Sequence, residues 1–83
     1  MEITEIQLRR MDTGNKMKAL AAVIFDDSFI IHDIRVIENE DRMLVVMPSR
    51  KYPDGSFGDI AHPLNSDMRQ RIEQAVLNEY QKK

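Results

Sequence analysis

Cysteine is absent from this chain of 83 residues, so neither a disulfide bridge nor a thiolate zinc site can stabilise it. The absence of disulfides fits a reducing cytosol. No apolar run approaches the roughly 18 residues that a membrane span needs, and residues 1–5 lack the basic start and apolar run of a signal peptide. We therefore expect a cytoplasmic protein with no membrane partner.

Glycine is scarce, and Gly14, Gly55 and Gly58 form neither a Walker motif nor a dinucleotide-binding pattern. Nucleotide-dependent chemistry, a cofactor and a small-molecule substrate are therefore not expected. The chain has no internal repeat or linker, and its length suits a single domain over residues 1–83. A core of this size rarely supplies more than about 3–5 kcal/mol unaided, which leaves oligomerisation as the route to extra stability.

Positive charge is not in excess, because the net charge is −2, with 12 basic and 14 acidic residues. Nucleic-acid-binding domains are usually basic. The distribution is uneven, however: positions 26–41 hold six acids and one base, which leaves a net charge of +3 on the rest of the chain. A basic face away from the acidic turns is compatible with this pattern, and so is the simpler interpretation that the charges only solvate the surface.

Alternating side chains predict four strands over residues 2–11, 16–25, 28–38 and 42–48, separated by polar turns at 12–15, 26–27 and 39–41. Residues 49–56 are expected to be irregular, because Pro53, Asp54 and Gly55 are a strong turn signal. A short fifth strand is expected over 57–62. The fold class is therefore α+β, an antiparallel meander of about five strands followed by one C-terminal helix.

The helix is expected from about Asn65 or Ser66, both good N-caps, to about Gln81. Asp67 suits the positive end of the helix dipole. An apolar stripe with helical spacing should face the sheet; it consists of Met68, Ile72, Ala75, Val76 and Tyr80.

The second, third and fourth strands are apolar on both faces. On the second strand, odd positions from Met17 to Phe25 share a face, opposite Leu20, Ala22 and Ile24. On the third strand, strict alternation predicts one face with Phe29, Ile31 and Ile37 and another with Ile30, Ile34 and Val36. One helix of about 16 residues, roughly 24 Å long, can cover only one face of the sheet. The uncovered apolar face must then contact something else, and a second copy of the chain is the simplest candidate, so we expect a homodimer. A sheet that curls into a half-barrel and buries that face on itself is the rival prediction.

Catalytic and metal sites are not expected. Ser66, His62 and Asp67 are residue types of hydrolase triads, but proximity in sequence is not triad geometry, and capping explains Ser66 and Asp67. His32 and Asp33 are adjacent and would point to opposite faces of a regular strand, so they should not reach one ion. His32 is expected to pack among isoleucines, and His62 to hold the turn before the helix.

Cations beside an aromatic ring provide the nucleic-acid signal. Arg50, Lys51 and Tyr52 are adjacent, and such residues can neutralise phosphates and stack on an unpaired base. Near the helix start, Arg69 and Arg71 lie close to free backbone N–H groups that can bind a phosphate. The chain has neither an RNA-recognition aromatic motif nor the helices of a helix-turn-helix, so these residue types alone favour a general interaction domain.

Several longer segments resemble the SpoVG family, the stage V sporulation protein G proteins of bacteria. The similar segments span nearly the whole chain, in order and at near-constant spacing: residues 16–19, 29–38, 46–51, 53–55 and 59–67. The family commonly reads Met-Pro-Ser-Lys-Arg, whereas the basic pair here is Arg50-Lys51, which keeps the charge and moves the guanidinium by one position.

The resemblance implies a dimeric, non-enzymatic regulator of sporulation and septation that binds nucleic acid, both DNA and RNA. Carried over to this chain, the resemblance makes Arg50, Lys51, Ser66, Arg69 and Arg71 the contact candidates. Tyr52 joins them as the aromatic residue beside the basic pair. The alternative is a protein-interaction module of the division septum in which nucleic-acid binding has no function. A small enzyme is the third and weakest hypothesis.

Overall fold

The computed structural model describes residues 1–11 and 16–82, and the predicted turn at 12–15 lies outside them. Six strands precede one helix: β1 (Ile3–Arg10), β2 (Met17–Phe25), β3 (Phe29–Asn39), β4 (Arg42–Val46), β5 (Ser49–Lys51), β6 (Phe57–Asp59) and α1 (Ser66–Gln81). The first four form an antiparallel sheet in the order β1-β2-β3-β4, and β5 and β6 form a separate two-stranded sheet. The α+β class is therefore confirmed.

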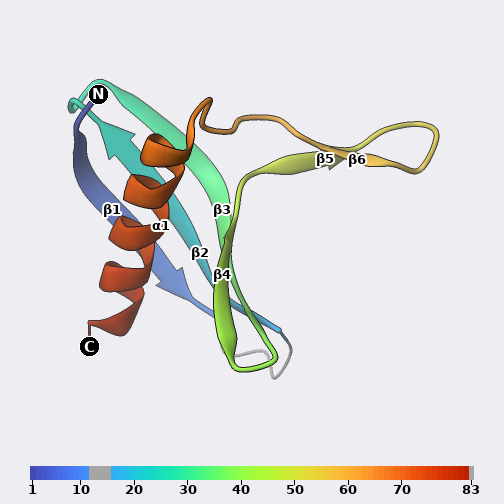
Figure 1. Ribbon diagram of the computed structural model, residues 1–83, viewed down its shortest axis with the longest axis horizontal. Helices are drawn as coiled ribbons and strands as arrows, with labels where there is room; N and C mark the ends of the chain where they lie inside the picture. Colours follow the sequence, from blue (N-terminus) through green and yellow to red (C-terminus); the bar gives the residue numbers. More distant parts are fainter. Residues whose placement is uncertain (12–15, 83) are drawn as a thin grey trace.

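The helix α1 packs against one face of the four-stranded sheet (Figure 1). Its buried residues are Ile72 and Val76, with Met68 and Tyr80 packed against the same core, as the apolar stripe predicts. The sheet contributes Phe25, Val23, Ile34 and Val36, whose side chains are less than 2% exposed. Burying such side chains supplies about 1.5–3 kcal/mol each. We call this the helix face of the sheet, and the opposite one the outer face.

The third strand departs from strict alternation, so the predicted faces of β3 were wrong. Ala21 pairs with Ile34, whereas Val23 pairs with Ile31, so one extra residue is inserted at His32–Asp33. This β-bulge switches the alternation, because two residues there oppose one on β2. Ile31 and Ile34 therefore both belong to the helix face, with Ile34 fully buried.

A second bulge corrects the first strand. Ile3 pairs with Phe25 and Glu5 with Ile24, so Thr4 is the extra residue. Ile3, which is out of phase with Ile6 in the sequence, is thereby returned to the core. The Thr4 hydroxyl donates to the carbonyl of Ile24 at 3.3 Å and accepts from the amide of Asp27 at 3.0 Å.

Two hairpin turns join β2 to β3 and β3 to β4. Asp26 and Asp27 have φ of 52° and 50°, and Glu40 and Asp41 have 52° and 66°. Positive φ at both central residues is the geometry of two-residue hairpin turns whose twist matches the flanking strands. The predicted tight turn at 26–27 is therefore confirmed.

The predicted fifth strand does not extend the main sheet. β6 ends at Asp59 and pairs only with β5, which lies inside the segment that was expected to be irregular. The half-barrel prediction is also wrong, because Ile30 and Leu44 on the outer face remain 37% and 42% exposed. Among the described helices, none is long and apolar enough to cross a membrane.

Candidate nucleic-acid interface

The strands β5 and β6 and the turn between them, residues 49–59, form a ribbon that we call the arm. It projects away from the sheet and the helix (Figure 1). Ser49 pairs with Asp59, Arg50 with Gly58, and Lys51 with Phe57. At the base of the arm, the amide of Ile60 donates to the carbonyl of Pro48 at 2.8 Å. The arm therefore carries Arg50, Lys51 and Tyr52, three of the predicted contact residues, beyond the body of the protein.

The turn at the tip of the arm is closed by short polar contacts. The amide of Tyr52 donates to the carbonyl of Ser56 at 2.7 Å, and the amide of Gly55, at φ 92°, donates to Tyr52. An Asp54 carboxylate oxygen accepts from the Ser56 hydroxyl at 2.6 Å and from its amide at 2.9 Å. These two hydrogen bonds lower the pKa of Asp54 because they stabilise the ionised carboxylate. The tip of the arm therefore carries a negative charge next to the cations of β5.

Arg50 and Tyr52 lie on the same side of the arm. The Arg50 guanidinium carbon is 5.5 Å from the centre of the Tyr52 ring, which is within cation–π range. The ring also covers Gly58, where a Cβ would come within 2.6 Å of Tyr52 atoms. Tyr52 nevertheless remains 41% exposed. A flat ring beside a cation that has no ion pair among the described residues, both open to solvent, can stack on a base and contact its phosphate.

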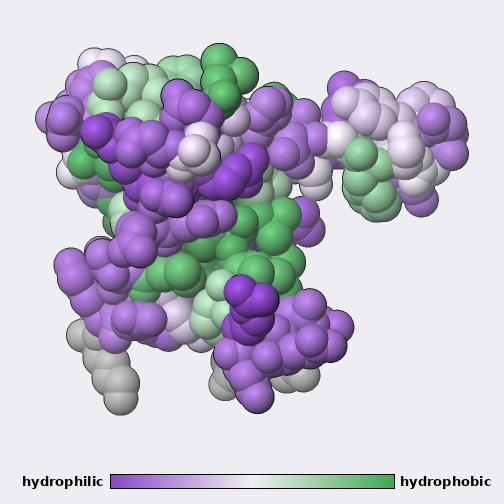
Figure 2. Space-filling model, viewed as in Figure 1, coloured by the Kyte–Doolittle hydropathy of each residue, from purple (hydrophilic) through white to green (hydrophobic). Residues whose placement is uncertain are grey.

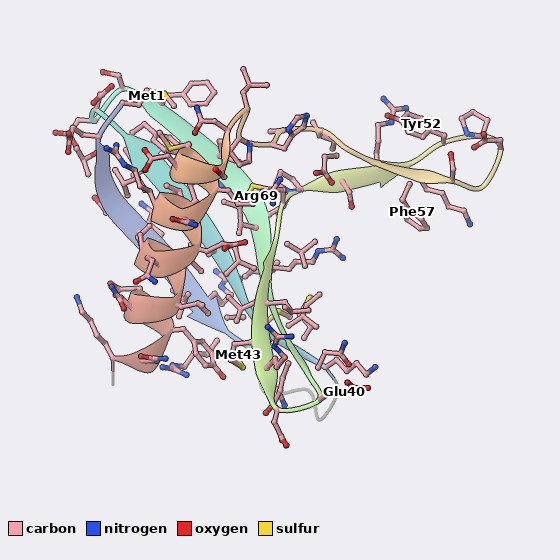
Figure 3. The ribbon with its side chains drawn as sticks, viewed as in Figure 1. Met1, Glu40, Met43, Tyr52, Phe57 and Arg69 are labelled. Carbon is pink, nitrogen blue, oxygen red and sulfur yellow. The ribbon has the colours of Figure 1, made fainter. Side chains whose placement is uncertain are left out.

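Lys51 is separated from this pair. It lies opposite Phe57 on β6, on the other side of the ribbon, because neighbouring strand residues alternate. Figure 3 shows Tyr52 and Phe57 pointing to opposite sides of the arm. The predicted trio therefore splits into an Arg50–Tyr52 side and a Lys51 side. A ligand that passes along one side of the arm contacts one of these cations directly and the other only at the edge.

The helix start holds the remaining three candidates. Asn65 is the N-cap, and its side-chain oxygen accepts from the Met68 amide at 2.7 Å, so Ser66 is the first residue of α1. Arg71 Nε lies 3.5 Å from the Asp67 carboxylate, and Arg71 also donates to the carbonyl of Met1 at 3.4 Å. Within the described residues, the side chain of Arg69 has no ion pair and is exposed. Asp67 weakens this site for a phosphate, because its charge repels an anion at the helix start.

The structure does not gather the six candidates into one patch. Figure 3 places Arg69 on the body at the beginning of α1 and Tyr52 far out on the arm. Residues 60–65 connect the two groups. A nucleic acid that contacted both would have to run from the arm to the helix, or the two groups would serve separate ligands.

The bulge on β3 borders a concavity of about 400 Å³ on the outer face. His32 and Asp33 both line it, and the bulge removes the regular alternation on which the prediction of opposite faces depended. His32 is exposed rather than packed among isoleucines. In the described part of the chain, no three His, Asp or Glu side chains gather as they would around a metal ion. His62 Nδ1 lies 3.0 Å from the carbonyl of Pro63, inside the turn it was expected to hold.

Two further exposed residues lie outside the six candidates. Arg9, one of the two cations that end the first strand, lies on the outer face beside the concavity and has no ion pair among the described residues. Phe57 is 70% exposed on the arm. Its neighbours Ser56 and Gly58 are a signal that could have identified it, because an aromatic residue between small ones has no apolar partner on a short strand.

Comparisons with known proteins cover nearly the whole chain. The family described as SpoVG matches residues 1–82. The "Putative septation protein SpoVG" of Thermoanaerobacter pseudethanolicus is 51% identical over 82 residues, which are 99% of this chain and 89% of that protein. Proteins of the same name from Oceanobacillus iheyensis and Staphylococcus carnosus are each 51% identical, over 82 and 80 residues. The matches cover 99% and 96% of this chain and 85% and 75% of those proteins.

Proposed function

Because the chain belongs to the SpoVG family, we propose that it is a homodimeric regulator that binds nucleic acid and takes part in sporulation and septation. The observation that carries the proposal is the Arg50–Tyr52 pair, exposed on an arm that projects from the body. An exposed ring beside a cation suits an unpaired base and its phosphate. The role in septation is proposed because the relatives are named as septation proteins.

Two copies explain how a chain with net charge −2 binds a polyanion. Each arm offers few cations, so a single copy would bind weakly. A dimer presents two arms to one strand, and the second contact then forms at a high effective concentration. Arg69 at the helix start adds a further exposed cation on each copy.

The test is the double variant Arg50→Ala, Lys51→Ala, measured by fluorescence anisotropy with single-stranded DNA, duplex DNA and RNA across a salt series. We expect the affinity to fall, and the slope of log K against log salt to decrease by about 0.9 for each lost phosphate contact on duplex DNA. The matched control is Lys16→Ala, Arg42→Ala, which removes two exposed cations away from the arm. Equal losses of affinity in the two double variants would mean that the arm contributes only its charge. An unchanged affinity in Arg50→Ala, Lys51→Ala would refute a role of the arm in binding.

A protein-interaction module of the septum is the second candidate. It is favoured by exposed apolar side chains along residues 57–64, where Phe57, Ile60 and Leu64 are 70%, 65% and 91% exposed. This function predicts association with a protein partner that is insensitive to salt, because apolar contacts are not screened. A pull-down in the same salt series as the nucleic-acid titration separates the two functions.

A further inference from the structure

Gly58 lies on β6 opposite Arg50, and its backbone conformation does not require glycine. Among the described glycines, only Gly55 has a positive φ. Glycine inside a strand is less favourable than alanine, because it loses more conformational freedom on folding. Where it occurs there, it often marks a point at which another group approaches the backbone closely. The space above Gly58 is therefore expected to be used by a neighbouring group.

That group is the ring of Tyr52. A Cβ at position 58 would lie 2.6 Å from both Cε2 and the hydroxyl oxygen of Tyr52, and 2.9 Å from its Cζ. A side chain at Gly58 would therefore force the ring to move. The phenol end of Tyr52 thus lies across the arm at Gly58, and the Arg50 guanidinium carbon is 5.5 Å from the centre of the same ring.

The tip of the arm holds the backbone of Tyr52. Its amide donates to the carbonyl of Ser56 at 2.7 Å, and its carbonyl accepts from the amide of Gly55 at 2.9 Å. The backbone is thus fixed by the tip and the ring lies against Gly58, while 41% of the residue remains exposed. A ring that is already held in place loses little further side-chain entropy when a ligand stacks on it. Gly58 and the tip therefore prepare the ring for binding.

The charges of the arm cancel. Residues 49–59 contain two basic and two acidic side chains, Arg50, Lys51, Asp54 and Asp59, so their net charge is zero. Figure 2 shows most of the visible surface of the arm in pale colours of intermediate hydropathy, whereas much of the surface over α1 is strongly hydrophilic. Affinity from phosphate contacts depends on the number of phosphates that cations neutralise. Binding at the arm therefore needs a contribution that does not depend on charge, and stacking of a base on an aromatic ring is such a contribution.

We infer that Gly58 is a positioning residue that keeps the Tyr52 ring along the arm beside Arg50, and that this side of the arm binds single strands with unpaired bases. One base stacks on the ring, and Arg50 contacts a neighbouring phosphate. In a duplex the bases stack on one another, so a base would have to leave the helix, at a cost in free energy, before its face could reach the ring. The inference rests on the proposed function and narrows its ligand to single strands.

The test compares a strand of thymidine nucleotides with an abasic sugar–phosphate strand of the same length, by fluorescence anisotropy in a salt series. We expect the wild type to bind the thymidine strand at least about fivefold more tightly, because the abasic strand keeps every phosphate but offers no base. Gly58→Ala should lower the affinity for the thymidine strand by a similar factor and leave the affinity for the abasic strand unchanged, because the added Cβ displaces the ring. The slope of log K against log salt should stay the same, because no phosphate contact is lost.

A double-variant cycle separates positioning from a general effect on the arm. If Gly58 acts through the ring, Tyr52→Leu should lower the affinity for the thymidine strand to the same extent, and adding Gly58→Ala to it should cause no further loss. Arg50→Ala is the control for charge, and it should weaken binding of both strands and reduce the salt slope. Circular dichroism checks that the variants fold, and Gly58 lies outside the hydrophobic core.

Three outcomes would overturn the inference: a wild type that binds the two strands equally, a Gly58→Ala variant that discriminates between them as strongly as the wild type, or a further loss when Gly58→Ala is added to Tyr52→Leu. In all three cases the protein still binds nucleic acid, so the proposed function stands. A wild type that binds neither strand, and neither duplex DNA nor RNA, at low salt would overturn the proposed function and this inference with it.

Discussion

Asp33 holds the backbone conformation that switches the faces of β3. Its φ is 66°, in the left-handed region, where a side chain costs roughly 1–2 kcal/mol and glycine costs least. Aspartate tolerates this region better than alanine does, because its short polar side chain can hydrogen-bond locally. The residue at this position therefore determines how readily the bulge forms, and with it whether Ile31 and Ile34 both reach the core.

We expect Asp33→Ala to lower the free energy of unfolding by about 1 kcal/mol and Asp33→Gly to leave it unchanged or raise it. Urea unfolding followed by circular dichroism measures both. His32→Ala, at the other bulge position, is the matched control and should have a smaller effect, because the φ of His32 is not in the left-handed region. A larger loss for glycine than for alanine would contradict the role of left-handed strain at this position.

The faces of β3 could not be predicted from the sequence because residues 29–37 are apolar at both alternations. In a strand with one polar face, a bulge shifts the apolar residues from odd to even positions or the reverse. That break in the alternation of apolar and polar residues would reveal the bulge in the sequence. Here either register places isoleucine inward. The first strand did carry a signal, since Ile3 was out of phase with Ile6, and the bulge at Thr4 is its cause.

At the scale of elements, α1 was predicted closely and the arm was missed for a physical reason. A helix of 16 residues shows several turns of apolar spacing and a cap. Strands of three residues are too short to show alternation, and Pro48 and Pro53 on either side of β5 are typical of loops. The three arm candidates were therefore found from their chemistry, without the geometry that separates Lys51 from Arg50 and Tyr52.

The start of α1 depends on Asn65, whose side chain satisfies the Met68 amide at 2.7 Å. We expect Asn65→Ala to lower the free energy of unfolding by about 1 kcal/mol, and Asn65→Asp to retain most of it, since both oxygens can accept that bond. Ser66→Ala is the control and should change stability little. Chemical denaturation compares the three variants, and an equal loss for Ser66→Ala would place the cap at residue 66 instead.

At the scale of the whole molecule, contacts between distant segments hold the helix on the sheet. The Arg10 guanidinium lies 4.4 Å from the centre of the Tyr80 ring and donates to the carbonyls of Tyr80 and Lys82. The contact joins the end of β1 to the end of α1, where cations are favourable. Spacing along the chain cannot predict such a pair, because its members are 70 residues apart. The contact engages Arg10, whereas the neighbouring Arg9 has no ion pair among the described residues.

The proposed homodimer, with its small core and exposed arm, predicts a stability that depends on protein concentration. If folding and dimerisation are coupled, dilution favours the unfolded chain by mass action. A tenfold change in protein concentration changes the free energy of unfolding by about 1.4 kcal/mol per dimer, or about 0.7 kcal/mol per chain. We therefore expect the melting temperature to rise by about 3–5 °C for each tenfold increase in concentration. Differential scanning calorimetry at several concentrations measures this. A wild-type melting temperature that is independent of concentration would contradict coupled folding and dimerisation.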